Sequence, residues 1–264
     1  MNGSRANPNA PRDPFQDFDI VYLVREVAPF KNNFEWIQRF GELMILQMPE
    51  DMQDPPGEGG DCFVYLMQFM DGNRIDLSIY PCERVEELSH DSLSVLLLDK
   101  DGLVKPFDPP SEADYLPKPP NAKAFADCCN EFWCVCPYVA KGLWRGEIIY
   151  ARYMLDQVVR EELMKMLTWQ IGVQSGYAVN PGKYGKYFQR YLQPEEWEML
   201  IKTFAAGSSE ETWQALFRMC ELFRGAAKAV GGHFGYAYPD GEDARVSAHL
   251  EHVRRLPREA REVY

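Results

Sequence analysis

The chain has 264 residues, 46% of them apolar, enough to bury the core of one large or two modest domains. Acidic residues outnumber basic ones by 40 to 28, and the resulting net charge of −12 disfavours a nucleic-acid partner and favours a small polycation. No apolar run approaches the roughly 20 residues of a membrane helix, and no signal segment opens the chain. We therefore expect a cytoplasmic protein without a membrane partner, whose seven cysteines remain thiols. Composition leaves the oligomeric state open.

The first part of the chain predicts a small mixed sheet. Segments of strand length, rich in Val, Ile, Leu, Tyr and Phe, cover residues 19–24, 43–48, 62–69, 74–79 and 95–98. Residues 33–40 predict a helix, and Asp71-Gly72-Asn73 predicts a hairpin turn between the third and fourth strands.

Residues 106–120 contain six prolines and few large apolar residues, which indicates a connection between domains at 1–120 and 121–264. Beyond it, apolar residues recur at helical spacing over residues 125–135, 138–171, 184–192, 195–204, 210–230 and 243–256. Pro137 is expected to kink or divide a helix, whereas Gly172, Gly207 and Gly231-Gly232 are expected at helix ends. The fold class is α+β, a mixed sheet followed by a helical bundle.

Three carboxylates in the predicted sheet form a candidate metal site. Asp17 and Asp19 are two apart at the start of a strand, so they project to one face, and two adjacent like charges favour a cation between them. The strand at 74–79 places Asp76 on the face opposite its apolar residues, where it is either a third carboxylate of this site or an acid paired with Arg74. Three carboxylates on neighbouring strands can hold two Mg²⁺ ions. The preceding Gly3-Ser4 turn would offer backbone N–H groups and a hydroxyl to phosphates.

Two weaker candidate sites lie in the predicted helical part. Asp127 and Glu131 share a helix face near Trp133 and are either contacts for guanidinium and amino groups or a solvated acidic face. Lys183 and Lys186 flank a glycine-rich turn and are either triphosphate contacts or solvated lysines.

The sequence resembles the nucleotidyltransferase superfamily with the polymerase β type of fold, and more closely the aminoglycoside 6-adenylyltransferase (streptomycin adenylyltransferase) family. The resemblance covers nearly the whole chain. It is carried by GSRANPNAPRDPFQDFDIVY (residues 3–22), FGELMILQMPEDM (40–52), DGNRIDLSI (71–79), LLDKDG (97–102), DCCNEFWCVCPYVAKGLWRGEI (127–148) and GKYGKY (182–187).

The resemblance implies transfer of AMP from ATP to a hydroxyl of streptomycin, which inactivates the antibiotic and confers resistance. Asp17 and Asp19 would hold two Mg²⁺ ions, and Asp76 would be a further ligand or the base that receives the hydroxyl proton. The predicted nucleotide contacts are Gly3, Ser4, Arg5, Lys183 and Lys186, and the predicted drug contacts are Asp127, Glu131 and Trp133.

Family members usually carry a helix and a strand ahead of the Gly-Ser turn, whereas this chain begins at Met1, almost on that turn. The predicted catalytic domain therefore looks shortened at its N-terminus, which would leave one sheet edge unpaired. Two alternatives remain: a nucleotidyltransferase for another small-molecule or protein hydroxyl, and an inactive nucleotide-binding homologue.

Overall fold

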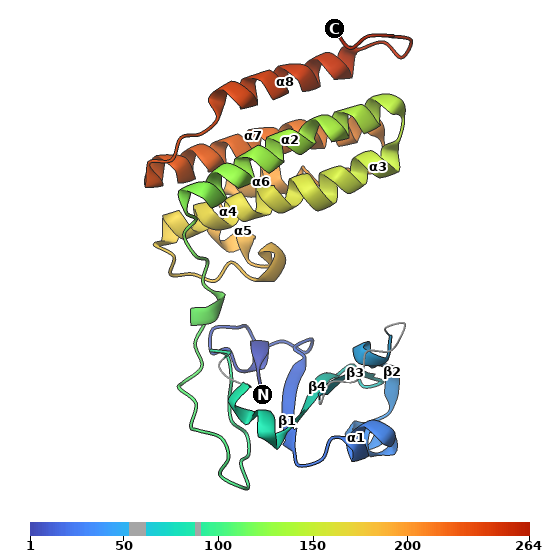
Figure 1. The fold of residues 1–264 in the computed structure, drawn as a ribbon, viewed down its shortest axis with the longest axis vertical. Helices are drawn as coiled ribbons and strands as arrows, with labels where there is room; N and C mark the ends of the chain where they lie inside the picture. The colour runs from blue at the N-terminus through green and yellow to red at the C-terminus, as the bar shows by residue number, and fades with distance from the viewer. Residues whose placement is uncertain (53–61, 88–90) are drawn as a thin grey trace. The chain divides into compact units, whose positions relative to one another are not determined.

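The computed structural model describes residues 1–52, 62–87 and 91–264. They form two compact units, Met1–Asp114 and Tyr115–Tyr264 (Figure 1). The first unit contains the strands and the second contains the long helices, so the α+β fold class is confirmed.

A four-stranded sheet organises the first unit. Its strands have the order β1-β4-β3-β2; β1 runs parallel to β4, and the other two pairs are antiparallel. The strands are β1 (Phe18–Val24), β2 (Leu43–Gln47), β3 (Phe63–Phe69) and β4 (Arg74–Pro81). The predicted hairpin is confirmed, because Asp71–Asn73 joins β3 to β4 and Asp71 Oδ1 accepts a hydrogen bond of 2.9 Å from the Asn73 amide.

Short helical turns connect these strands. They are η1 (Gly3–Arg5), α1 (Ala28–Asn32), η2 (Glu35–Phe40), η3 (Pro49–Met52), η4 (Cys82–Glu87) and, before the second unit, η5 (Ala113–Tyr115). The predicted helix at 33–40 is therefore a 3-10 turn that begins two residues later. The predicted strand at 95–98 is wrong, because these residues do not pair with any described strand. The regular backbone contact in this region is a single bridge between Ser94 and Asn2.

Alternation along the strands divides the sheet into an apolar and a polar face. All four odd-numbered residues of β3 are buried, and Leu77 and Ile79 of β4 join them in one core with Ile37 of η2. The opposite face of β4 carries Arg74 and Asp76, as predicted from the period of two. Burial of the apolar face thus fixes which way Asp76 projects.

The second unit is a bundle of helices (Figure 1). Its elements are α2 (Ala122–Arg145), α3 (Ile148–Tyr153), the π-helical turn η6 (Met154–Val159), α4 (Arg160–Ser175), η7 (Lys183–Gly185), α5 (Phe188–Tyr191), α6 (Pro194–Ile201), α7 (Ser209–Phe234) and α8 (Asp240–Arg255). In the bundle, α4 packs against α7, and α2 packs against both α7 and α8.

The helix boundaries differ from the predicted ones at particular residues. Pro137 does not divide α2, which continues to Arg145 and ends where Gly146 adopts a left-handed φ of 79°. Gly172 lies inside α4 rather than at its end, since a Cβ there would come within 2.4 Å of the Tyr177 ring. Gly146 is thus needed for its backbone conformation and Gly172 for a close contact.

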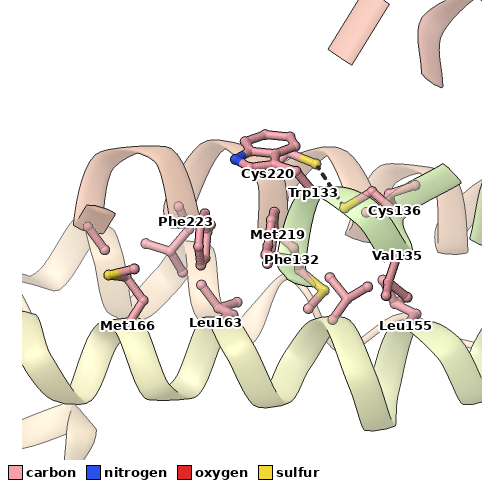
Figure 2. Close-up of a cluster of buried hydrophobic side chains, with 14 of the residues drawn as sticks. Phe132, Trp133, Val135, Cys136, Leu155, Leu163, Met166, Met219, Cys220 and Phe223 are labelled. Atoms are coloured by element: carbon pink, nitrogen blue, oxygen red, sulfur yellow. Dashed lines mark hydrogen bonds between the residues drawn. The ribbon is translucent and has the colours of Figure 1, made fainter. Parts of the chain in front are cut away.

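The core of the bundle combines aromatic and sulfur-containing side chains (Figure 2). Phe132 of α2 stacks on Phe223 of α7 with ring centroids 3.8 Å apart. Cys136 and Cys220 also meet between these helices, with their sulfur atoms 4.0 Å apart, and both are free thiols. Large apolar groups therefore fill the space between α2, α4 and α7 without a cross-link.

A buried polar network joins α8 to α7. Arg224 donates from Nε and Nη2 to the two carboxylate oxygens of Asp243, at 2.5 and 2.6 Å, and Tyr238 donates to Asp243 at 2.8 Å. Although burial opposes it, this set of donors lowers the pKa of Asp243. The charge is fully paired, as a buried ion requires.

Over the described ranges, none of the helices combines the length and the apolar character that crossing a bilayer requires.

Candidate active site

Asp19 and Asp76 lie opposite each other on the parallel strands β1 and β4. Asp17 precedes β1, and Arg74 of β4 lies near two of these acids: its Nε is 2.8 Å from Asp76 Oδ1 and 3.9 Å from Asp17 Oδ2. The pairing of Asp76 with Arg74, expected as an alternative to a metal site, is therefore present. The three acids and one arginine form a cluster with excess negative charge.

The charge of this cluster is incompletely neutralised. Burial raises the pKa of Asp19, and the neighbouring carboxylates Asp76 and Asp17 raise it further, while Arg74 opposes them. Asp76 Oδ1 is buried and, despite its short ion-pair distance to Arg74, accepts no hydrogen bond from the described residues because the alignment is poor. A cation beside Asp19 and Asp76 would relieve both features.

The Gly3 turn lies directly against Asp19. Gly3 has a φ of 71°, and a Cβ at this position would come within 2.3 Å of Asp19 Oδ2. The Asn2 amide donates to Asp19 O at 2.8 Å, and the Gly3 amide donates to Leu93 O at 3.1 Å. The Gly3 N–H is therefore already bonded within the protein, whereas the glycine itself is required for the close approach to the carboxylate.

Arg5 holds the turn to the segment that carries the acids. Its Nε and Nη2 donate to Gln16 O at 3.1 and 2.7 Å, and Nε also lies 3.2 Å from Asp17 O. The guanidinium lies 3.5 Å from the centre of the Phe18 ring. These contacts make Arg5 a positioning residue. The sequence pattern gives no sign of these hydrogen bonds across the bend, and the predicted contact of Arg5 with the nucleotide stays a prediction.

In the second unit, Asp127 and Glu131 of α2 line a pocket of about 560 Å³. Across it, α4 contributes Glu162 and Trp169, which sequence reasoning did not select. They are seven residues apart, and this spacing of two helical turns is the signal that could have identified them as one face. Three carboxylates and an indole in one pocket suit a ligand that carries positive charge.

The acids of this pocket also have cationic neighbours within the protein. Lys123 forms an ion pair with Asp127 one turn away on the exposed surface of α2. Lys165 donates to both oxygens of Glu162, at 2.7 and 2.9 Å. Glu131 is exposed and forms no ion pair with any residue that the structure describes. The exposed pair of Lys123 with Asp127 contributes little to stability and can be exchanged for a ligand, whereas Glu162 is buried.

Trp133 is a core residue. Its side chain is 1% exposed, its ring packs edge-on against Phe132 and Phe223, and its Nε1 donates to the Tyr238 hydroxyl oxygen at 3.1 Å. Residues two apart on a helix face in different directions, so Trp133 points away from Glu131. It lines a different pocket, together with Asn130 and Arg245, and its predicted contact with the drug stays a prediction.

Lys183 and Lys186 are exposed on the turn between α4 and α5. Each ammonium lies over the ring of the next residue along the chain, at 5.1 Å for Tyr184 and 5.6 Å for Tyr187. The structure therefore places both cations at the surface of the second unit, where an anion can reach them.

Comparisons with known proteins agree over most of the chain. The family model described as streptomycin adenylyltransferase matches residues 1–253. The chain is 42% identical to an aminoglycoside 6-adenylyltransferase of Bacillus subtilis, over 92% of this chain and 86% of that protein, and 41% identical to one of Campylobacter jejuni, over 90% and 83%. A crystal structure of an aminoglycoside 6-adenyltransferase from Bacillus subtilis is also similar. The aligned region covers 92% of this chain and 90% of that chain, with a TM-score of 0.51 and 40% identity.

The mixed sheet, the glycine turn against Asp19 and these likenesses define the class of the protein, which is that of the nucleotidyltransferases. Within this class, the chain belongs to the streptomycin adenylyltransferase family.

Proposed function

We propose that the protein transfers AMP from ATP to a hydroxyl group of an aminoglycoside of the streptomycin type and so confers resistance to it. Membership of the family and the names of its relatives support this activity. The observation that carries the chemistry is the register of β1 and β4, which sets Asp19 opposite Asp76 beside the Gly3 turn. A nucleotidyl transfer needs such a concentration of carboxylates.

Asp17, Asp19 and Asp76 would hold Mg²⁺, with two ions as the proposed number. The residues fit this metal: Asp76 Oδ1 is a buried oxygen that accepts no hydrogen bond although Arg74 lies beside it, and the pKa of Asp19 is raised by burial and by the acids around it. In the described ranges, no three acidic, histidine or cysteine side chains are grouped so that they could hold a metal ion by themselves, so water and phosphate oxygens would have to supply the other ligands. When bound, Mg²⁺ supplies activation of the hydroxyl and neutralisation of the pyrophosphate.

The chain's own residues would position the reacting groups. In the reaction, the acceptor oxygen forms a bond to the α-phosphorus, the bond from that phosphorus to the pyrophosphate oxygen breaks, and the hydroxyl proton passes to a base. Asp76 is proposed as that base or as a ligand. The Gly3-Ser4 turn is proposed to contact phosphate through Ser4, because the Gly3 N–H is bonded to Leu93 O. Lys183 and Lys186 would neutralise the triphosphate.

The pocket of Asp127 and Glu131 is the proposed contact for the acceptor. Streptomycin carries guanidinium groups, and carboxylates bind these through paired, charge-assisted hydrogen bonds. Glu162 and Trp169 extend the same pocket, with Trp169 providing a ring over which a cation can lie. The net charge of −12 adds a long-range attraction for a cationic drug.

Pyrophosphate release from ATP and Mg²⁺ tests the proposal, measured with streptomycin, with other aminoglycosides and with no acceptor. Release that depends on streptomycin is the expected result. Release that depends on a different hydroxyl compound would keep the class and change the acceptor, whereas ATP binding without release under any condition would support a nucleotide-binding homologue.

A further inference from the structure

Three cations gather without carboxylate partners where α4 connects to α5. Lys183, Lys186 and Arg190 are exposed, and Arg190 and Lys186 both lie over the Tyr187 ring, at 4.2 and 5.6 Å. Other cations of this unit, such as Lys202 and Lys228, pair with carboxylates, but these three form no ion pair with any residue that the structure describes. A group of exposed cations without carboxylate partners suits an anionic ligand.

The same turn holds Tyr184 in a strained conformation. Its φ of 57° and ψ of 27° are left-handed, a region that side chains with a Cβ disfavour. Tyr177 shares this feature, but its ring packs against Gly172. Tyr184 has no such compensation, since it is 88% exposed and its ring contact is the Lys183 ammonium. The fold thus keeps the ring of Tyr184 in solvent beside cations, on a backbone that is strained.

Local packing fixes the turn in this shape. Gly182 and Gly185 both have a φ of 76°, and a Cβ on Gly185 would come within 2.5 Å of Met164 Cε on α4. The Tyr187 amide donates to Pro181 O at 3.0 Å and closes the turn. The ring and the cations are therefore presented on a rigid support, which reduces the entropy lost when a ligand binds.

We propose that Tyr184 and Arg190 join Lys183 and Lys186 in binding ATP, with Arg190 contacting the triphosphate and Tyr184 stacking on the adenine. This inference rests on the proposed function. Arg binds phosphate through paired donors, and an exposed aromatic ring can stack on the flat face of a nucleobase. A cationic aminoglycoside would be repelled here, whereas a ligand with both an anionic tail and a flat ring satisfies both features.

Binding measurements on the full chain separate the two roles. The ligands are ATP and inorganic tripolyphosphate, and the variants are Tyr184→Gly, Tyr184→Phe, Arg190→Gln and, as a control, Lys202→Gln. We expect Tyr184→Gly to weaken ATP binding about tenfold and leave tripolyphosphate binding unchanged, because only ATP has a base to stack. Its melting temperature should not fall, since glycine accepts the left-handed conformation. Tyr184→Phe, which keeps the ring, should bind ATP like the unchanged chain.

Arg190→Gln should weaken the binding of both ligands by about tenfold, and Lys202→Gln should change neither. ATP binding that is unaffected by Tyr184→Gly and Arg190→Gln overturns the inference while the proposed function stands. Equal losses of ATP and tripolyphosphate binding in Tyr184→Gly also overturn it, because the ring would then act only through the turn. A chain that binds no ATP at all would overturn both proposals.

Discussion

The two units treat their buried charges in opposite ways. In the helical unit, Asp243 receives donors from Arg224, Tyr238 and Ser247, and its pKa is lowered despite burial. In the sheet unit, Asp19 is surrounded by other acids, and its pKa is raised by burial and by those acids. A carboxylate with several donors joins two helices, whereas one that is surrounded by like charges is available to a cationic ligand. Repulsion between neighbouring carboxylates therefore marks the candidate site better than charge alone.

Their apolar cores differ in the same sense. The helical unit buries one continuous cluster with side chains from α2 through α8, and Figure 2 shows the part of it between α2, α4 and α7. Over the described residues, the cluster of the sheet unit is confined to β3, β4 and Ile37. The larger core supplies enough stability for the helical unit to include a buried polar network. The smaller core leaves the polar face of its sheet for chemistry.

Replacing Asp19 with Asn is expected to give the largest effect. The variant should lose about a thousandfold in kcat/KM, equivalent to ~4 kcal/mol, because a central carboxylate of the site is gone. It should also be more stable than the unchanged chain without Mg²⁺, by about 0.5–1 kcal/mol, since a repelled charge is removed. Steady-state kinetics and thermal unfolding measure the two effects.

Asp101→Asn is the matched control for Asp19→Asn, because Asp101 forms an exposed ion pair with Arg25. It should change neither activity nor stability appreciably. A loss of stability in Asp19→Asn that accounts for its loss of activity would contradict the comparison.

Replacing Arg224 with Met should produce the opposite pattern. It leaves Asp243 buried without its cation and should destabilise the helical unit by about 3 kcal/mol. Hydrogen exchange resolved by segment should show the loss in α7 and α8 while Mg²⁺ still protects the sheet unit. Arg254→Met, which removes an exposed pair with Glu210, is the control and should cost less than about 1 kcal/mol. Equal effects of both variants would mean that the buried pair has no special role.

Gly3→Ala sharpens the account of the sheet unit. A methyl group would meet Asp19 Oδ2 and would also require a left-handed alanine, so we expect a loss of stability of about 1–2 kcal/mol and at least a tenfold loss of activity. Gly102→Ala is the control: its φ of 66° imposes the same backbone strain, but no atom lies within 4 Å of the added Cβ. Equal activity in the two variants would show that contact with Asp19 is unimportant.

Asp127→Asn tests the acceptor pocket. The KM for streptomycin should rise about tenfold, equivalent to ~1.4 kcal/mol, with little change in the KM for ATP. Asp240→Asn is the control, because Asp240 pairs with Lys228 away from the pocket residues. If only the KM for ATP changed, Asp127 would contact ATP and not streptomycin, which would contradict the proposal.

The smallest expected effect is opposite pH dependence in the two units. Because the folded pKa of Asp19 is raised, its ionisation destabilises the metal-free sheet unit as pH rises from 3.8 through the folded value. Because the folded pKa of Asp243 is lowered, its contribution is present at neutral pH and is lost as pH falls below 3.8. Hydrogen exchange against pH, with Asp19→Asn and Arg224→Met as references, measures both. A common slope in both units would contradict the assignment.

Features that depend on residues close together in the sequence, such as strands and the faces of a strand, could be predicted. Four of the five predicted strands are confirmed because their length and their content of Val, Ile, Leu, Tyr and Phe are local features. The position of Asp76 opposite Leu77 and Ile79 is confirmed because alternation of period two is read directly. The strand at 95–98 failed because an apolar run does not specify a pairing partner. A division of the helix at Pro137 is ruled out because the proline is tolerated within α2, whose end is set by Gly146. The local sequence pattern does not reveal which segments pair or where a helix ends.

The candidate site was predictable where it depends on spacing and unpredictable where it depends on folding. Asp17, Asp19 and Asp76 stay the proposed catalytic acids, and the spacing of the first two and the strand face of the third selected them. The burial of Trp133, the anchoring of Arg5 and the pocket partners Glu162 and Trp169 depend on contacts between distant segments. None of these leaves a short-range signature.

Mass spectrometry of streptomycin after incubation with ATP and Mg²⁺ tests the central claim most directly. With the unchanged chain, we predict streptomycin that carries one AMP, and with Asp19→Asn, we predict unmodified drug in the presence of a folded protein. Unmodified drug with the unchanged chain, or an equal yield of product with Asp19→Asn, would contradict the account.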